Sequence, residues 1–579
     1  MNRRNVALAA AAFAVTAILA VLAVRPSIRP QTDAGFIDSV EAVLAADASA
    51  LSLPADLAEG SRGVAYVALR SGGVRLAEAW QVGADADEAY MRALIEARDA
   101  IEPDERADVD IVESVVSGPP ENVGIDGLTN LERGVAGLSV ELPDGRELVA
   151  GPTEMLADNT SFERVLELFV EGGSASQEEI DAARIGLFGA KQFLVDLEAD
   201  ALIRMERGNE LVPAAAVSQE TVGGLADGMS SWLVEQLADD GRMVYEYFPS
   251  RGDESDSNNM IRQWMATIAL IRVAGGTEDA QLYDRIARNI DYNLATAYST
   301  DGDLGLIADP DGDVKLGAVA LAALAISQHP DRDRWAAEEA ALRRTVGHLW
   351  QADGSFVTFY VPAGRNDNQN FYPGEALLLW ALTLEDATDA DLLDRFMRSF
   401  EYYRAWHREQ PNPAFVPWHS MSYETVWRLT GDDELRDFVF EMNDWLIPTM
   451  QQWESAPSGD VAGRFYSAEH PEYGPPHASS DGVYLEGLVA AHRLAVAVDD
   501  AERLEAYRTA IARGLRHLMQ LQFADAVDMY YVSQRDRVAG GLRTTGYDNR
   551  IRVDNVQHGL LAVLNILETF DPDDFRIAE

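Results

Sequence analysis

The chain has 579 residues, enough for two or more domains with large buried cores, so neither a disulfide nor a metal is needed to stabilise it. It contains no cysteine, which excludes disulfides, thiol catalysis and thiolate metal sites. Its 96 acidic residues outnumber 47 basic ones, a formal net charge of -49 that excludes a basic nucleic-acid-binding face.

The first 25 residues carry the pattern of an export signal. Arg3 and Arg4 precede the apolar run "VALAAAAFAVTAILAVLAV", and Arg25 follows it. This pattern is typical of a signal peptide or a signal anchor. The run is long and has no clean A-x-A cleavage site near its end, which favours an uncleaved anchor. Both alternatives predict an exported protein with a periplasmic or extracellular ectodomain. If the segment is an uncleaved anchor, the protein is attached to the inner membrane.

A small α+β domain is predicted over residues 36–197, between a spacer at 26–35 and a linker at 198–218. Alternating apolar residues around Ser71-Gly72-Gly73 predict a hairpin, and further strands are expected within 110–118 and 134–151. Helical periodicity predicts helices over 85–101, 161–169 and 176–197.

Three segments of this domain carry a family resemblance: "VESVVSGPPENV", "LERGVAGLSVELPDGRELVAGP" and "SFERVLELF". In order and spacing, residues 60–170 resemble the small AMMECR-type α/β domain. The cysteine-containing glycine loop of that family is absent, because "GGVRLAEAW" stands where it would fall. No active-site residue is therefore transferred from the family.

From residue 219 onward the pattern changes to helices that are alternately amphipathic and apolar on all sides. Twelve are predicted, at 219–238, 258–274, 279–297, 315–328, 332–352, 373–385, 389–408, 417–430, 433–453, 480–498, 502–521 and 554–570. The apolar members must be covered on nearly every side, whereas the amphipathic ones keep a wet face. We therefore expect six inner helices surrounded by six outer ones over residues 219–579.

The phrases "YPGEALLLWALTL", "EQLADDGRMVYEY" and "HLWQADGSFVTFY" make this region similar to a known architecture. Residues 219–570 resemble the (α/α)6 toroids of six-hairpin glycosidase-like domains, which include glucuronyl C5-epimerases, N-acylglucosamine 2-epimerases and unsaturated glucuronyl hydrolases. The resemblance implies a toroid that acts on carbohydrate.

Loop lengths predict where this toroid works. Turns from inner to outer helices are short, and connections from outer to inner helices are long, aromatic and charged, so the long connections share one rim. Function usually resides on loops held by a rigid scaffold. The inner helices also begin at this rim, where their positive dipole ends favour an anion such as an acidic sugar.

Carboxylates within the inner helices are the catalytic candidates: Glu375, Glu424 and Glu486. A ring of such groups around one cavity supplies an acid and a base. Glu375 also fits a residue that stabilises a helix N-terminus, while Glu424 and Glu486 lie inside apolar helices and also fit a buried structural pair.

Polar and aromatic residues near the starts of the inner helices are the candidates for substrate binding. They are Arg262, Lys315, Tyr372, Trp418, His419, Asp481, Tyr484 and His558. An arginine can clamp a carboxylate, and a tryptophan can stack on a sugar ring. The alternatives are structural: an ion pair for Arg262, satisfied core histidines for His419 and His558, and an N-cap for Asp481.

No metal or cofactor is expected. "DPDGDV" lacks the glutamate that closes a calcium loop, and the nine histidines are dispersed. Together these patterns predict an exported enzyme that binds an anionic, uronic-acid-type sugar in an (α/α)6 cavity and acts as a hydrolase, epimerase or lyase. The alternative is a non-catalytic scaffold of the cell envelope that binds carbohydrate or protein.

Overall fold

The computed structural model describes residues 33–48 and 50–577, and its first part is built on one antiparallel sheet of seven strands. The strand order is β2-β1-β3-β6-β4-β5, and β7 also pairs with β6. The strands are β1 (Val64–Ser71), β2 (Val74–Val82), β3 (Ile111–Asn122), β4 (Ala136–Glu141), β5 (Glu147–Ala150), β6 (Arg184–Asp196) and β7 (Ala201–Met205). The sheet therefore continues into the segment expected to be a linker.

Helices cover this sheet unevenly. α2 (Ala34–Leu44) and α4 (Ala86–Asp99) pack on one face through apolar side chains such as Val40, Leu94 and Val67. The short helices α3 (Ala55–Ala58), α5 (Pro152–Ala157), α6 (Phe162–Glu171) and α7 (Gln177–Asp181) complete the domain. The predicted hairpin at residues 71–73 and the helices at 85–101 and 161–169 are confirmed.

The helix predicted over residues 176–197 is wrong beyond its first turn. Only α7 is helical, and β6 follows as a strand of thirteen residues. Gly186 and Gly189 weaken a helix in this segment, and β3, β4 and β7 supply ladder partners for β6. Pairing with three strands outweighs the local helical periodicity.

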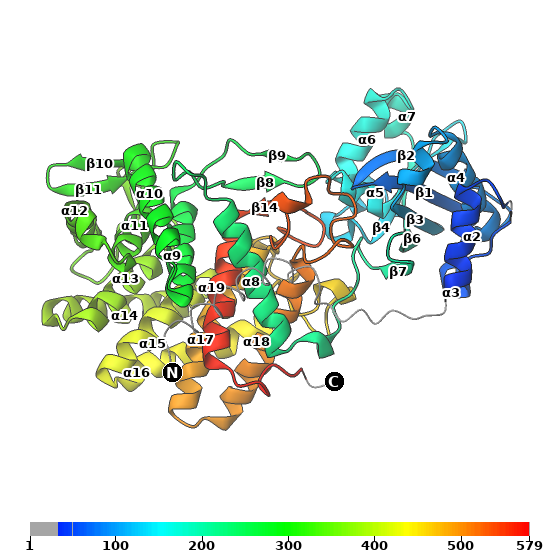
Figure 1. Ribbon diagram of the computed structural model, residues 1–579. Coiled ribbons are helices and arrows are strands. Elements are labelled where there is room, and N and C mark those ends of the chain that lie inside the picture. Colours follow the sequence, from blue (N-terminus) through cyan, green and yellow to red (C-terminus); the bar gives the residue numbers. More distant parts are fainter. Residues whose placement is uncertain (1–32, 49, 578–579) are drawn as a thin grey trace, which may run out of the picture.

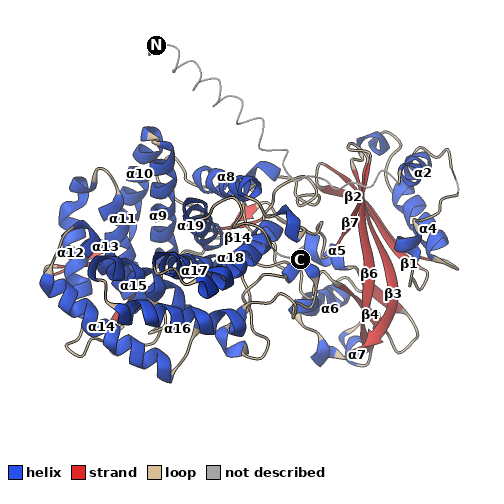
Figure 2. Cartoon of the chain, turned by 90° about the horizontal axis from the view of Figure 1, so that it is seen from below, coloured by secondary structure: helices blue, strands red, loops and turns tan. Residues whose placement is uncertain are grey.

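The second part of the chain is a closed double ring of helices, as the sequence predicts. Its members are α8 (Gln219–Glu235), α9 (Met260–Thr277), α10 (Ala280–Ala297), α11 (Leu316–Gln328), α12 (Ala336–Leu349), α13 (Tyr372–Asp386), α14 (Ala390–Glu409), α15 (Val416–Thr430), α16 (Asp433–Met450), α17 (Ala478–Ala497), α18 (Ala501–Leu521) and α19 (Val553–Thr569). The inner ring runs α9-α11-α13-α15-α17-α19 and closes where α19 packs against α9. Figure 2 shows this ring nearly end on.

Burial distinguishes the two rings in the predicted way. In α11 every residue from Leu316 to Ile326 is buried, as an inner helix requires. Each outer helix covers an inner one, and α8 covers α19, the last inner helix. An apolar surface on all sides forces a helix inside, because water contact on any side would expose hydrocarbon.

The two rims of the toroid differ in chain length. Turns between inner and following outer helices are short, for example the two residues between α9 and α10. The long connections at the other rim carry small strands: β8 (Glu246–Phe248), β9 (Asp253–Glu254), β10 (Tyr298–Asp301), β11 (Leu304–Ile307), β12 (Val314–Lys315), β13 (Phe359–Val361) and β14 (Ile551–Arg552). The predicted separation of long and short connections is confirmed.

The small domain rests on two of these long connections (Figure 1). Arg207 donates from Nε to Asp460 at 2.6 Å, and both side chains are buried. Asn549 donates to the carbonyl of Leu156 at 2.8 Å. The small domain is thereby joined to the connections 451–477 and 522–552.

The predicted anchor, residues 1–25, lies outside the described residues. Within residues 33–48 and 50–577, no helix combines the length and the apolar character needed to cross a bilayer.

Candidate functional site

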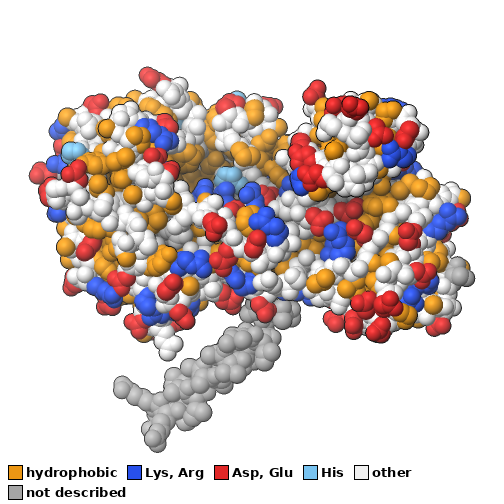
Figure 3. All heavy atoms as spheres, turned by 90° about the horizontal axis from the view of Figure 1, so that it is seen from above, with side chains coloured by type: hydrophobic (Ala, Val, Ile, Leu, Met, Phe, Trp, Pro, Cys, Tyr) orange, Lys and Arg blue, Asp and Glu red, His pale blue; other side chains and the backbone are white. Residues whose placement is uncertain are grey.

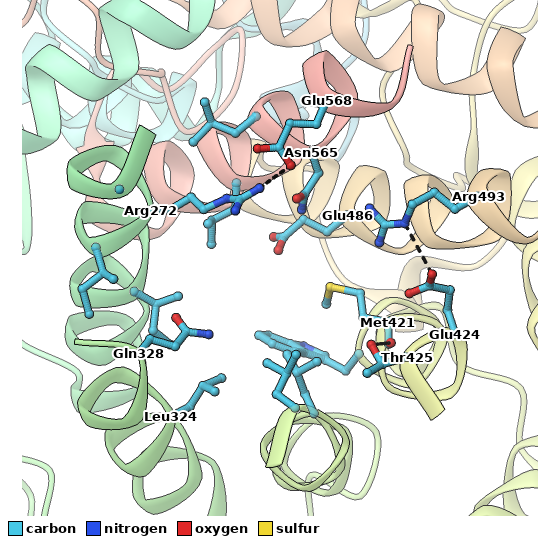
Figure 4. Close-up of a pocket in the computed structure, with 18 of the residues that line it drawn as sticks. Arg272, Leu324, Gln328, Met421, Glu424, Thr425, Glu486, Arg493, Asn565 and Glu568 are labelled. Carbon is cyan, nitrogen blue, oxygen red and sulfur yellow. Dashed lines mark hydrogen bonds and ion pairs between the residues drawn. The ribbon is translucent and has the colours of Figure 1, made fainter. Parts of the chain in front are cut away.

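The toroid encloses a cavity of about 810 Å³ between its inner helices. All six inner helices line it, mostly with residues from their middle and C-terminal parts (Figure 4). Arg272, Gln328 and Glu568 at its edge are exposed, so the cavity opens at the rim of short turns.

This opening differs from the working face that loop length suggests. Loop length shows which rim carries the longer connections. The width of the cavity depends instead on the size of the side chains that point into the ring at each level. Gly275, Gly276 and Ala497 line the cavity near its open end and leave space there. The long-connection face, seen in Figure 3, is also hollowed, with arginine or lysine side chains along the edge of the hollow.

Glu486, on α17, is a buried carboxyl at the inner part of the cavity. Its Oε1 lies 2.8 Å from Nδ1 of His558 on α19. Burial raises the pKa of Glu486 above its usual range, and the hydrogen bond to His558 only partly offsets this effect. A carboxyl with a raised pKa is suited to hold a proton and to donate it.

Glu424, on the neighbouring helix α15, lies in a contrasting environment. Its Oε1 is 2.9 Å from Nε of Arg428, one turn later on the same helix, and 3.6 Å from Nε of Arg493 on α17. A carboxylate paired with arginine in this way is suited to accept a proton. One cavity thus combines a carboxyl whose burial favours the protonated form and a carboxyl paired with two arginines.

Aromatic and sulfur-containing side chains form the apolar lining beside these acids. Trp418 and Met421 of α15 and Met265 of α9 line the cavity. The Trp418 ring meets the His558 ring edge to face, with centroids 5.9 Å apart. A tryptophan in this position offers a surface on which a sugar ring can stack.

Of the eleven residues that the sequence nominates, three line this cavity: Trp418, Glu424 and Glu486. His558 joins them through its hydrogen bond to Glu486. The other seven do not line it, and they are Arg262, Lys315, Tyr372, Glu375, His419, Asp481 and Tyr484.

Two of these seven, Glu375 and His419, are buried in the walls. Glu375 is 3% exposed, and burial raises its pKa to about 8. His419 is completely buried, stacks on Phe415 at a centroid distance of 3.5 Å and bonds its carbonyl through Nδ1 at 2.8 Å. Burial lowers the pKa of His419 to about 3, so His419 is a neutral structural residue.

Ion pairs engage two predicted substrate-binding residues near the long connections. Arg262 contacts Asp554 at 2.9 Å, with Tyr245 as a second partner, and Lys315 pairs with Asp309. This arrangement fits the ion-pair alternative for Arg262. In the described residues, neither cation lacks an acidic partner.

The remaining three have local partners. Asp481 accepts the backbone N–H of Phe465 at 2.7 Å and lies 3.1 Å from His517, and the N-cap of its helix is His477. The rings of Tyr484 and Tyr372 pack on aromatic neighbours, Phe465 and Phe359 respectively.

Sequence reasoning missed the polar residues at the open end of the cavity: Arg272, Gln328, Arg428, Arg493, Asn565 and Glu568. Each lies within the last two turns of an inner helix. A signal was available, because charged residues recur there in otherwise apolar helices and Glu424 precedes Arg428 by four positions.

Metal ligands are not gathered in the described part of the chain. Within residues 33–48 and 50–577, no group of three or more His, Asp or Glu side chains is arranged to hold an ion.

No model of a known protein family matches the chain, and no curated protein matches it. Solved structures do show similarity. A D-mannose isomerase has 13% identity and a TM-score of 0.46, over 61% of this chain and 98% of its own. An unsaturated glucuronyl hydrolase specific for heparin has 8% identity and a TM-score of 0.42, over 60% and 97%.

An α-1,6-mannanase of Salegentibacter sp. HEL1_6, in complex with α-1,6-mannotriose, has 11% identity and a TM-score of 0.41, over 60% of this chain and 100% of its own. Identities and scores are low in all three comparisons. Because the scores are too low to establish the fold, the assignment of a toroid depends on the closed ring formed by this chain's own helices.

Proposed function

We propose that this protein is a carbohydrate-active enzyme that transfers protons to and from a saccharide held in the toroid cavity. The observation that carries the proposal is the convergence of Glu424 and Glu486 on one cavity, beside Trp418. The two carboxyl groups lie in environments that favour opposite protonation states, the arrangement that assigns acid and base.

Each residue has a separate role in this proposal. Glu486 is the acid, because burial favours its protonated form and His558 orients it. Glu424 is the base, held ionised by Arg428 and Arg493. Trp418 supplies the apolar surface on which the sugar stacks.

The proposed substrate is an anionic, uronic-acid-type saccharide. Three arginines line the cavity, and two of its three glutamates, Glu424 and Glu568, are paired with them. Arg493 contacts its glutamate at only 3.6 Å, so an acidic sugar would meet a cation with which it can pair.

Export is part of the proposal and rests on residues 1–25 alone. Arg3, Arg4 and the apolar run that follows them would direct the rest of the chain across the inner membrane and keep it attached there. Fractionation of cells that express the full chain checks this, because a cytoplasmic location would contradict it.

Incubation of the purified protein with uronic-acid polysaccharides and with neutral mannan tests the enzyme. New reducing ends without unsaturated products would identify hydrolysis. New reducing ends with unsaturated products would identify elimination, and deuterium uptake into an uncleaved chain would identify epimerisation. Removing an acid or base typically costs about 100-fold to 10,000-fold in rate, so Glu424→Gln and Glu486→Gln should each lose at least about 100-fold. Glu409→Gln, on the outer helix α14, is the control and should keep its rate.

Binding of these glycans without any product would contradict the enzyme and favour the scaffold. If Glu424→Gln and Glu486→Gln both retained the wild-type rate, the assignment of these two carboxyl groups as acid and base would be wrong.

A further inference from the structure

The three arginines of the cavity are not equally engaged. Arg272 pairs with Glu568. Arg428 pairs with Glu424 and with Glu385, and each of these two contacts of Arg428 is 2.9 Å long. Among the described residues, Arg493 has a single ion pair, at 3.6 Å, with the Glu424 oxygen that Arg428 also contacts. A distance of 3.6 Å is too long for a hydrogen bond.

Arg493 lies on the side of its helix that faces the cavity. It follows Glu486 on α17 by seven residues, so the two side chains lie on one face of the helix about 10 Å apart along its axis. Both line the cavity, and the Arg493 side chain is 36% exposed (Figure 4). A ligand that reaches Glu486 from the open end passes the level of the helix at which Arg493 lies.

We infer that Arg493 determines specificity by binding the anionic group of the sugar at the open side of the cavity, in exchange for its contact with Glu424. This inference rests on the proposed function, because it takes the cavity as the saccharide site. A carboxylate accepts both hydrogen bonds of the guanidinium fork, which Glu424 at 3.6 Å does not. A sulfate group offers the same chemistry.

The exchange leaves Glu424 with one cavity arginine in place of two. Arg428 keeps its contact at 2.9 Å, so Glu424 is still paired with a cation when an acidic ligand is bound. A neutral sugar leaves the contact between Arg493 and Glu424 in place and forms no ion pair with Arg493.

Calorimetric titration of the full-length protein tests this inference. The probes are a disaccharide with a uronic acid, a sulfated disaccharide without one, and a neutral disaccharide, all in the Glu486→Gln background to prevent turnover. Charge-assisted hydrogen bonds contribute about 1.5–3 kcal/mol, so Arg493→Ala should weaken the acidic disaccharide about 10-fold to 100-fold. Binding of the neutral disaccharide should change less than about twofold, and Arg493→Lys should fall between.

Arg436→Ala is the matched control, because Arg436 pairs with acids on the outer helix α16, away from the cavity. It should bind all three probes as the parent does. Thermal melting should be the same for the Arg493 variants and the parent, which separates lost contact from lost folding.

Each outcome has one reading. If Arg493→Ala weakened binding of the acidic and neutral disaccharides equally, or weakened neither, the role of Arg493 would be overturned. The same would follow if the parent protein bound the anionic and neutral probes with equal affinity. If Arg493→Ala weakened binding of only the sulfated disaccharide, the anion that Arg493 binds would be a sulfate. If it weakened binding of only the uronic-acid disaccharide, the anion would be a carboxylate. If the preference for an anionic disaccharide depends on Arg493 but the wild-type protein converts no substrate, the proposed enzyme activity is wrong and the assignment of Arg493 as the specificity residue is retained.

Discussion

Replacing Glu375 by glutamine isolates the cost of one buried carboxyl. Glu375 lies in the first turn of α13, is 3% exposed, and its Oε2 has no hydrogen-bond partner among the described residues. It faces the backbone of Gly317 on α11, where an added Cβ would meet the carboxylate oxygen at 1.7 Å. The structure thus gives Glu375 neither a capping bond nor a place in the cavity, and burial alone raises its pKa to about 8.

The magnitude follows from that pKa. Below the ordinary value of 4.5, folded and unfolded chains both hold the proton, and Glu375 has no pH-dependent effect. Between 4.5 and about 8 only the folded chain holds it, so the free energy of unfolding falls by about 1.4 kcal/mol per pH unit. The full loss has an upper bound of about 5 kcal/mol and becomes constant above pH 8.

Urea denaturation of the wild type and Glu375→Gln at pH 5, 6, 7 and 8 measures this effect. The variant should gain stability relative to the wild type at each step, because glutamine has no proton to lose. Glu154, whose pKa burial also raises to about 8, is present in both proteins and cancels. Glu401→Gln, an exposed carboxyl on α14, is the control. A difference between Glu375→Gln and the wild type that stays constant from pH 5 to 8 would refute the reasoning.

Three further predictions concern packing, the domain contact and acid stability. Gly482→Ala would place a Cβ 2.5 Å from the backbone nitrogen of Gly559 and should cost at least about 2 kcal/mol by urea denaturation, whereas Gly223→Ala on α8, with nothing within 4 Å, should gain about 1 kcal/mol. Arg207→Met leaves Asp460 buried without its ion pair and should cost about 3–5 kcal/mol; an unchanged melting temperature would contradict this. His419, whose pKa is lowered to about 3, takes up a proton only in the unfolded chain between pH 6.5 and 3, so the wild type should lose more stability than His419→Asn between pH 7 and pH 4.

The double ring was predictable because it depends on local pattern. An inner helix must be apolar on all sides, and α11 shows this in its sequence as clearly as in its burial. Connection lengths likewise follow from counting residues between helices. The hairpin at Ser71-Gly72-Gly73 was predictable for the same reason, since turn chemistry and alternation are local signals.

Strand pairing over long sequence distances made the helix prediction for residues 176–197 wrong. The periodicity of residues 176–197 favours a helix, yet β6 forms because β3, β4 and β7 supply its hydrogen-bond partners. Nothing in the segment itself records that these strands lie beside it.

The sequence by itself determined that Glu424 and Glu486 lie within inner helices, because their neighbours are apolar over several turns. Only the tertiary structure decided that these two share a cavity while Glu375 is directed into the wall, and that the cavity opens at the short turns. The direction of a side chain around a helix depends on which neighbours it meets across the ring. Those neighbours lie tens to hundreds of residues away, as Glu486 and its partner His558 illustrate.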